Sequence, residues 1–160
     1  MRYACWCVVI MALCAVSCRT LPPNDGSTAG FNALKPGTGE EIPLILAEDG
    51  KATRAVLIPS DPTPQEEKAA GELAKWLGEM TGAEFAIHAE DGEAPAGKRI
   101  SVGRTRLLAE AGVAAADADL GNEGYAIAVA NGNLFLLGGR KRGPIYAVFA
   151  LLEEDLGCRW

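Results

Sequence analysis

Residues 124–137 read Gly-Tyr-Ala-Ile-Ala-Val-Ala-Asn-Gly-Asn-Leu-Phe-Leu-Leu. Two apolar runs flank Asn131-Gly132, and Asn-Gly between such runs is the strongest short signal for a β-hairpin. Both faces of this hairpin are apolar, so we expect it to lie centrally in a sheet, covered by helices. The loop 138–143 follows, and Pro144 suits the first position of a last helix. The apolar stripe of that helix consists of Ile145, Val148, Phe149, Leu152 and Leu156.

A second helix is predicted upstream, where Thr63-Pro64-Gln65-Glu66 has the pattern of a capping box. Thr63 can accept from the free N–H groups of the first turn, and Glu66 can return the bond. Gly82 is expected to end the helix in a left-handed conformation. Its apolar stripe consists of Ala69, Leu73, Trp76, Leu77 and Met80.

The remaining apolar runs predict strands. Residues 44–47 and 54–58 form an expected hairpin around Asp49-Gly50. Further strands are expected at 84–88 and 99–103, and a short helix at 106–111. The resulting order, β-β-α-β-β-α-β-β-α, predicts an α+β (layered α/β) fold: a small mixed sheet with helices packed on it.

Size and charge exclude several classes of protein. The 160 residues cannot hold a complete (β/α)₈ barrel, which takes about 250. The formal net charge of −6 argues against a nucleic-acid partner, because such partners require a basic face.

The N-terminus has the pattern of a targeting signal. Arg2 precedes an uncharged apolar run over residues 4–16, which is too short for a full membrane span and typical of a secretory signal. Residues 15–18, Ala-Val-Ser-Cys, resemble a bacterial lipobox, although Ala15 stands where that pattern usually has Leu. We therefore expect a lipoprotein signal peptide over residues 1–18 with lipid attached to Cys18. An ordinary signal peptide cut nearby and a buried N-terminal helix are the alternatives.

Residues 19–43 are rich in Pro and Gly and show no apolar period, so they are expected to form a flexible linker. The chain would be exported and anchored through lipid to a membrane of the bacterial cell envelope, periplasmic or outer. Residues 44–160 would form the folded domain. Cys158 is the one cysteine in that domain, so no disulfide framework is available to it.

Three segments of the domain resemble one known family. They are the helix end Glu79-Met80-Thr81-Gly82-Ala83-Glu84, the strand Ile100-Ser-Val-Gly103, and the stretch from Gly138 to Trp160. Together they resemble the N-terminal accessory domain of bacterial α-glucuronidases and β-N-acetylhexosaminidases. The resemblance implies a small sheet with helices packed on it, preceding a catalytic (β/α)₈ barrel that this chain lacks. It also implies that the chain is the front end of a longer hydrolase, whose catalytic carboxylates lie in the barrel.

The chain's own candidates for chemistry are few. Glycoside hydrolysis needs two carboxylates about 5–9 Å apart across a sugar. Glu66-Glu67 and Glu153-Glu154 are adjacent on helices and point in different directions, so neither is a natural dyad. His88 is the single histidine, and no Cys/His set has the spacing of a metal site. We expect no catalytic residue, no metal and no cofactor in this chain.

Cations and aromatic residues near the C-terminus are the candidates for a binding surface. The loop with Arg140, Lys141 and Arg142 precedes a helix N-terminus, so it is either an anion site for a group such as a uronate carboxylate or a tight turn that Arg142 ties down. Tyr146 and Trp160 fit a domain interface or, alternatively, a platform for stacking sugars. The candidate interface or ligand-contact residues are Arg140, Arg142, Tyr146, Arg159 and Trp160.

Two functions follow from these patterns. The first is a non-catalytic accessory domain of an exported hydrolase that degrades polysaccharide, with the downstream barrel as partner. The second is a self-standing surface lipoprotein that binds carbohydrate or a protein. For either, Tyr146, Ala150 and Leu151 lie off the main stripe of the last helix and predict a second, outward apolar face.

Overall fold

A computed structural model of the chain describes residues 10–11, 44–93, 96–113 and 120–159. Its elements, in chain order, are β1 (Ile10–Met11), β2 (Leu44–Ile45), β3 (Ala47–Glu48), β4 (Lys51–Ala52), β5 (Ala55–Ile58), α1 (Pro64–Thr81), β6 (Ile87–Ala89), β7 (Arg99–Val102), α2 (Arg106–Glu110), β8 (Tyr125–Ala130), β9 (Asn133–Gly138), α4 (Gly143–Ala150) and the π-helical turn η1 (Leu151–Asp155).

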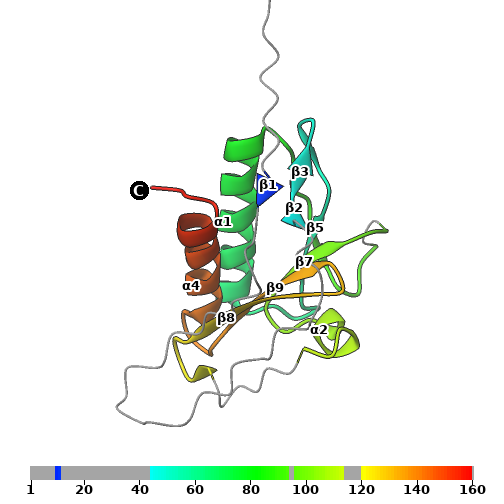
Figure 1. Ribbon diagram of the computed structural model, residues 1–160. Coiled ribbons are helices and arrows are strands. Elements are labelled where there is room, and N and C mark those ends of the chain that lie inside the picture. The colour runs from blue at the N-terminus through cyan, green and yellow to red at the C-terminus, as the bar shows by residue number, and fades with distance from the viewer. Residues whose placement is uncertain (1–9, 12–43, 94–95, 114–119, 160) are drawn as a thin grey trace, which may run out of the picture.

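The main sheet has five strands in the order β6-β5-β7-β9-β8. The first four run parallel, and β8 is antiparallel to β9. α1 and α4 lie side by side on one face of this sheet (Figure 1). The expected fold class, a mixed sheet with helices packed on it, is confirmed.

The hairpin expected around Asp49-Gly50 forms, but with a different second strand. Both turn residues have positive φ, 49° and 71°, as a two-residue turn matching the twist of a hairpin requires. The turn joins β3 to β4, with Ala47 opposite Ala52. Residues 54–58 were expected to complete this hairpin, which is wrong. They form β5, which pairs in parallel with both β6 and β7, because an apolar strand gains most when both of its faces are covered.

β1 and β2 form a further antiparallel pair, with Ile10 opposite Ile45 and Met11 opposite Leu44. Arg54, the residue before β5, links β2 to the turn of the β8–β9 hairpin. Its Nε donates to the Ile45 carbonyl over 2.9 Å, and its Nη1 donates to the Gly132 carbonyl.

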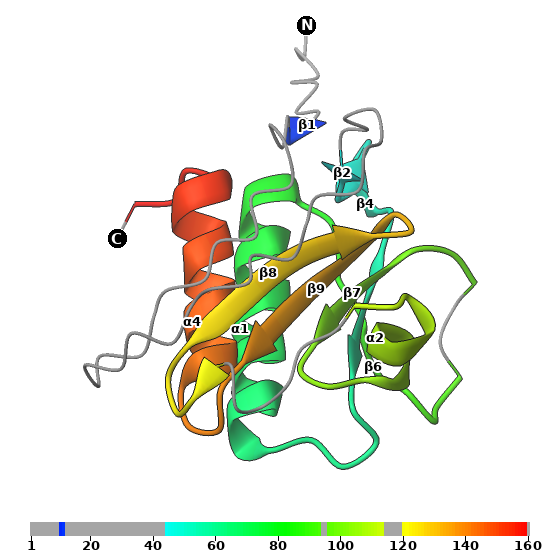
Figure 2. The ribbon, with the colours of Figure 1, turned by 60° about the horizontal axis from the view of Figure 1, so that its bottom comes forward.

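The hairpin over residues 125–138 is confirmed, with Asn131 and Gly132 at positive φ of 51° and 74°. Its expected central position is wrong in part, since β9 is an inner strand but β8 forms an edge of the sheet. Apolar cover on both faces explains the pattern. Leu134 and Leu136 join the core under the long helices, whereas Phe135 and Leu137 join a second cluster with Leu108 of α2. Figure 2 shows α2 on the sheet face opposite α1 and α4.

Helix α1 begins and ends where the sequence predicts. The Thr63 side chain accepts from the Glu66 N–H, the Glu66 carboxylate accepts from the Thr63 N–H over 2.8 Å, and Gly82 ends the helix at φ 71°. Leu73 and Leu77 are fully buried, while Trp76 is half-buried, with its indole N–H donating to Glu72 over 3.0 Å.

Two other elements differ from expectation. The strand expected at 84–88 is shorter and later, spanning Ile87–Ala89, and Phe85 before it is buried in the core. The last helix buries a stripe one position away from the expected one, made of Pro144, Ala147, Val148, Leu151 and Leu152. Leu151 was expected to face outward, which is wrong, because its side chain is fully buried.

Cys18, the linker 19–43 and Trp160 lie outside the described residues. Within the described part of the chain, no helix is long and apolar enough to cross a membrane.

Candidate functional site

The candidate residues lie at two ends of the last helix. Arg140, Arg142 and Tyr146 lie where β9 passes into α4, at the carboxyl ends of the parallel strands. Arg159 follows η1 at the other end. Residues 143–155 span about 20 Å at 1.5 Å per residue, so the structure does not bring the two sets together.

Glycine makes the turn into α4 possible. A Cβ added to Gly138 would lie 1.9 Å from the Pro144 nitrogen, and one added to Gly139 would lie 2.4 Å from the Gly121 carbonyl oxygen. At Gly143 it would lie 2.4 Å from the Gly124 carbonyl oxygen. Real Cβ atoms do not approach other atoms so closely. Residues 138–143 therefore pack backbone to backbone against the loop 120–124.

Hydrogen bonds complete this packing. The N–H groups of Gly139, Arg140 and Lys141 donate to the carbonyls of Gly124, Gly121 and Asn122 over 2.7, 3.2 and 2.7 Å, respectively. These three loop N–H groups are used within the fold and are not available to an anion. Residues 138–143 form a tight turn, and the Arg140, Lys141 and Arg142 side chains are exposed.

Arg142 and Tyr146 form a pair one helical turn apart. Hydrogen bonding to Tyr146 and the charge of the nearby Glu123 raise the pKa of Arg142 above its ordinary value. Tyr146 is half-buried and packs against the core. The Arg142 side chain itself is exposed at the start of α4.

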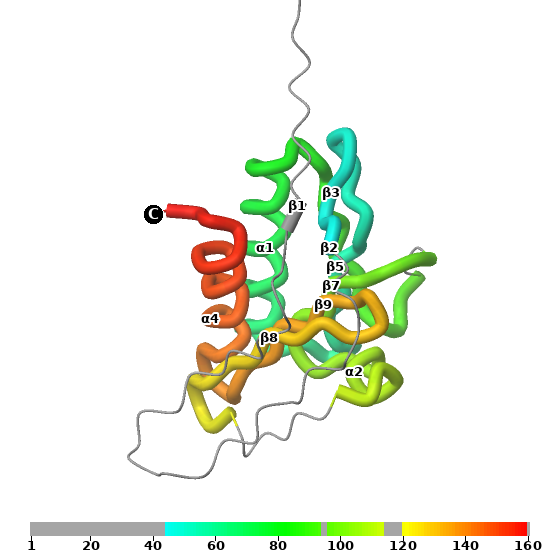
Figure 3. The backbone as a smooth tube through the Cα atoms, in the orientation of Figure 1, coloured from blue at the N-terminus to red at the C-terminus, as the bar shows by residue number. Residues whose placement is uncertain are grey.

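The end of the last helix is fixed on α1. Gly157, at φ 72°, turns the chain, and the Cys158 N–H donates to the Leu152 carbonyl over 2.9 Å. The Cys158 thiol then meets the Met80 sulfur at 3.2 Å. The backbone tube makes this turn next to α1 (Figure 3). Two of the three segments that carry the resemblance, residues 79–84 and 138–160, therefore meet in space.

Comparison with known protein families shows which family the chain belongs to. The family described as "Glycosyl hydrolase family 67 N-terminus" matches residues 46–151, about two thirds of the chain. The chain belongs to this family. The suspected resemblance to the α-glucuronidase N-terminal domain is confirmed. No curated protein matches the chain.

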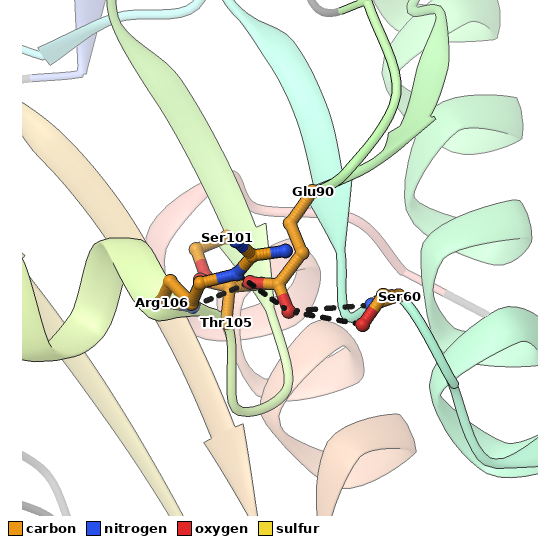
Figure 4. A network of polar contacts seen from close by, with 5 residues as sticks. All are labelled: Ser60, Glu90, Ser101, Thr105 and Arg106. Carbon is orange, nitrogen blue, oxygen red and sulfur yellow. Dashed lines mark hydrogen bonds and ion pairs between the residues drawn. The ribbon is translucent and has the colours of Figure 1, made fainter.

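This domain has a polar network around Glu90, at the border between surface and interior, that the sequence analysis missed. Glu90 follows β6, and its side chain is 10% exposed. Its carboxylate accepts from the Arg106 N–H at the start of α2. It also accepts from the N–H and the hydroxyl of Ser60, which follows β5, each over 3.4 Å. The Arg106 guanidinium lies 3.6 Å away. Figure 4 shows Glu90 between the two partners, with Ser101 and Thr105 beside them.

Electrostatics at Glu90 favour the charged form. Burial alone raises the pKa of a carboxyl group, but the N–H groups of Arg106 and Ser60 and the Arg106 charge outweigh it and lower the Glu90 pKa below its ordinary value. Next to it, the Ser101 and Thr105 hydroxyls share a hydrogen bond of 2.7 Å in the buried interior. The network joins loops after three parallel strands, so its role is to hold this edge of the sheet together. A Glu-Asp-Gly turn after a strand was the one sequence signal that could have drawn attention to it.

The acid pairs and the histidine that the sequence singled out have different surroundings. Glu66 is used in the helix cap, and Glu67 is exposed. Glu153 and Glu154 are both exposed on η1. The His88 Nε2 is buried with no hydrogen-bond partner in the described part of the chain. Among the described residues, no group of three His, Cys, Asp or Glu side chains could hold a metal ion.

Proposed function

We propose that this chain is the exported, non-catalytic N-terminal accessory domain of a glycoside hydrolase of the α-glucuronidase type. Its role is to dock on the downstream catalytic barrel and to shape that barrel's surroundings. The observation that carries the proposal is the family 67 N-terminus match over residues 46–151.

The geometry of the acids supports the non-catalytic part. A glycosidase places two carboxylates about 5–9 Å apart, facing one another across the sugar. In this domain Glu66 and Glu90 are held by hydrogen bonds that build the fold, and Glu153 and Glu154 are neighbours on one helical turn. Neighbouring side chains on a helix diverge, so they cannot flank one glycosidic bond.

Export with lipid attachment is a proposal on the sequence alone. The uncharged run 4–16 followed by Ala-Val-Ser-Cys18 supports it. Mass spectrometry of the mature N-terminus tests it. Acylated Cys18 is the expected result, and Cys18→Ser should give an unacylated product. A wild-type product that begins elsewhere or lacks acyl mass would contradict it.

The accessory role is tested on the gene and on the protein. We expect the reading frame to continue beyond the codon of Trp160 into a barrel of several hundred residues. The 160-residue chain should hydrolyse no aryl glycoside or uronide above a buffer blank, whereas the extended protein should release uronic acid. Glu153→Gln and Glu154→Gln should leave the activity of the extended protein unchanged.

A stop codon after Trp160, together with a stable chain, would instead favour the self-standing surface lipoprotein. Turnover by the 160-residue chain that disappears in the Glu153→Gln or Glu154→Gln variant would overturn the non-catalytic assignment.

A further inference from the structure

The two long helices on the same sheet face differ in composition. α1 is amphipathic, and its exposed positions include Lys68, Lys75 and Glu79. By contrast, residues 143–152 of α4 and η1 contain no charged side chain. A helix that is apolar all round belongs in a buried position, whereas an amphipathic helix suits the surface.

The sheet and α1 cover one side of α4, and Ile145, Tyr146 and Ala150 pack against the margin of the core. Ala147, Val148, Leu151 and Leu152 are fully buried against the core. The other side retains four half-buried apolar residues, which form two pairs spaced four residues apart and so lie together. We call this set the outer face of α4: Ile145, Tyr146, Phe149 and Ala150.

Charged groups border the outer face of α4. Arg142 is exposed at one end and is bonded to Tyr146. Glu153 is exposed at the other end, where the Arg159 guanidinium lies 3.4 Å from the Glu153 carbonyl oxygen. An apolar centre with charged residues at its border is the arrangement of a protein–protein interface, in which Tyr and Arg are enriched.

The path of the chain identifies the partner. The chain turns at Gly157, is fixed by Cys158 on Met80, and brings Arg159 back over η1. The described chain therefore reaches Arg159 beside the Glu153 end of the outer face of α4. In the proposed function, the partner of this N-terminal domain is the catalytic domain of the same hydrolase.

We infer that the outer face of α4 is the surface on which the catalytic domain of the same protein docks. This rests on the proposed function and adds to it the surface that makes the contact. The cationic loop 140–142 would then lie at the border of the interface rather than at its centre.

The test measures association between the 160-residue chain and the separately produced catalytic domain by calorimetry. Ala150→Arg places a long cation in the outer face of α4 and should raise the Kd at least tenfold. Gly71→Arg is the matched control, because Gly71 is exposed on neighbouring α1 with open space around a Cβ, and it should leave the Kd unchanged. Thermal unfolding of each variant verifies the fold.

A second measurement needs no variant. Amide hydrogen exchange over residues 143–155 should slow when the catalytic domain is added to the wild-type chain, while exchange at the exposed Glu67 and Lys68 of α1 should not change. This keeps the inference testable even if Ala150→Arg fails to fold.

Three outcomes count against the inference or its basis. If the wild-type chain and the Ala150→Arg variant bind the catalytic domain with the same Kd, the inference is overturned and the proposed function stands. The chain could instead associate with itself, lose that association in Ala150→Arg and fail to bind the catalytic domain. A second copy would then occupy the outer face of α4, and the inference would be overturned. A wild-type pair that does not associate at all contradicts the docking role in the proposed function itself.

Discussion

The Cys158 thiol donates to the Met80 thioether sulfur over 3.2 Å, although the two residues are 78 positions apart. The contact joins the C-terminal segment to the last turn of α1. It matters because both side chains are half-buried and lie where the chain leaves the helical layer. Sulfur is polarisable and adapts to irregular gaps, so the pair packs two segments that no regular element joins.

Removing either sulfur should loosen this joint. We expect Met80→Ala and Cys158→Ala each to lower the free energy of unfolding by about 1 kcal/mol, below the 2–5 kcal/mol of a fully buried methionine, because both sites are half-buried. The double variant should cost about 0.5 kcal/mol less than the two effects combined, since the residues are in contact. Urea unfolding measures all three. Arg159→Ala, next to Cys158 and exposed, should change the stability by less than about 0.5 kcal/mol. Strictly additive effects would show that the sulfur contact contributes nothing.

Two adjacent residues of the last helix should respond in opposite ways. Leu151 is fully buried, so Leu151→Ala should lower the unfolding free energy by roughly 2–5 kcal/mol. Ala150 lies on the outer face of α4, so Ala150→Ser should cost about 0.5 kcal/mol or less. Equal effects at the two positions would mean that the helix is rotated from the orientation described.

The sequence could not predict which side of the last helix faces the core. Residues 143–152 are apolar on nearly every side, so the pattern offers several stripes of similar quality. Burial of Ala147 and Leu151 in the core selects one of them, and the π-helical turn over residues 151–155 shifts the side chains that follow. In α1, by contrast, charged residues on the outside leave one stripe, and the prediction of its buried residues succeeds for Ala69, Leu73 and Leu77.

Short-range chemistry was predictable and long-range pairing was not. The capping box at Thr63 and Glu66 and the Asn131-Gly132 turn depend on neighbours within four residues, so their residue types suffice. Strand β5 pairs with strands about 30 and 45 positions later, and the parallel order depends on where α1 crosses. The Glu90 network combines three loops of that parallel edge, so it could be recognised only after the strand order was known.

Glu90 should make the domain sensitive to acid. Its pKa is lowered in the folded state, so its stabilising contribution is present above its ordinary pKa of 4.5 and is lost as the pH falls through the lower folded value. Glu90→Gln should cost about 1 kcal/mol at pH 7, because hydrogen bonds to a charged acceptor weaken and the exposed Arg106 contributes little. That difference should shrink as the pH falls below about 4.5.

Denaturant unfolding from pH 7 to pH 3 measures the effect, with Glu93→Gln as control. Glu93 is exposed on the same loop, so its variant should follow the wild type at every pH. A Glu90→Gln variant whose stability difference stays constant down to pH 3 would contradict the assigned ion pair and hydrogen bonds.

The close approach of loops 138–143 and 120–124 gives the last prediction. In Gly139→Ala the new methyl group would lie 2.4 Å from the Gly121 carbonyl oxygen and 2.8 Å from that of Leu120. Both are backbone atoms and cannot rotate away, so the loops must separate. We expect a loss of about 1–3 kcal/mol, as for other cases of overpacking. Separation also breaks the bonds from the Arg140 and Lys141 N–H groups to Gly121 and Asn122, so their amide hydrogens should exchange faster. Gly71→Ala in the open, exposed part of α1 should instead stabilise the domain by about 0.5–1 kcal/mol through helix propensity. If Gly139→Ala were as stable as the wild type with unchanged exchange at Arg140, the glycine would not be required for this turn, and the close approach of the two loops would need another cause.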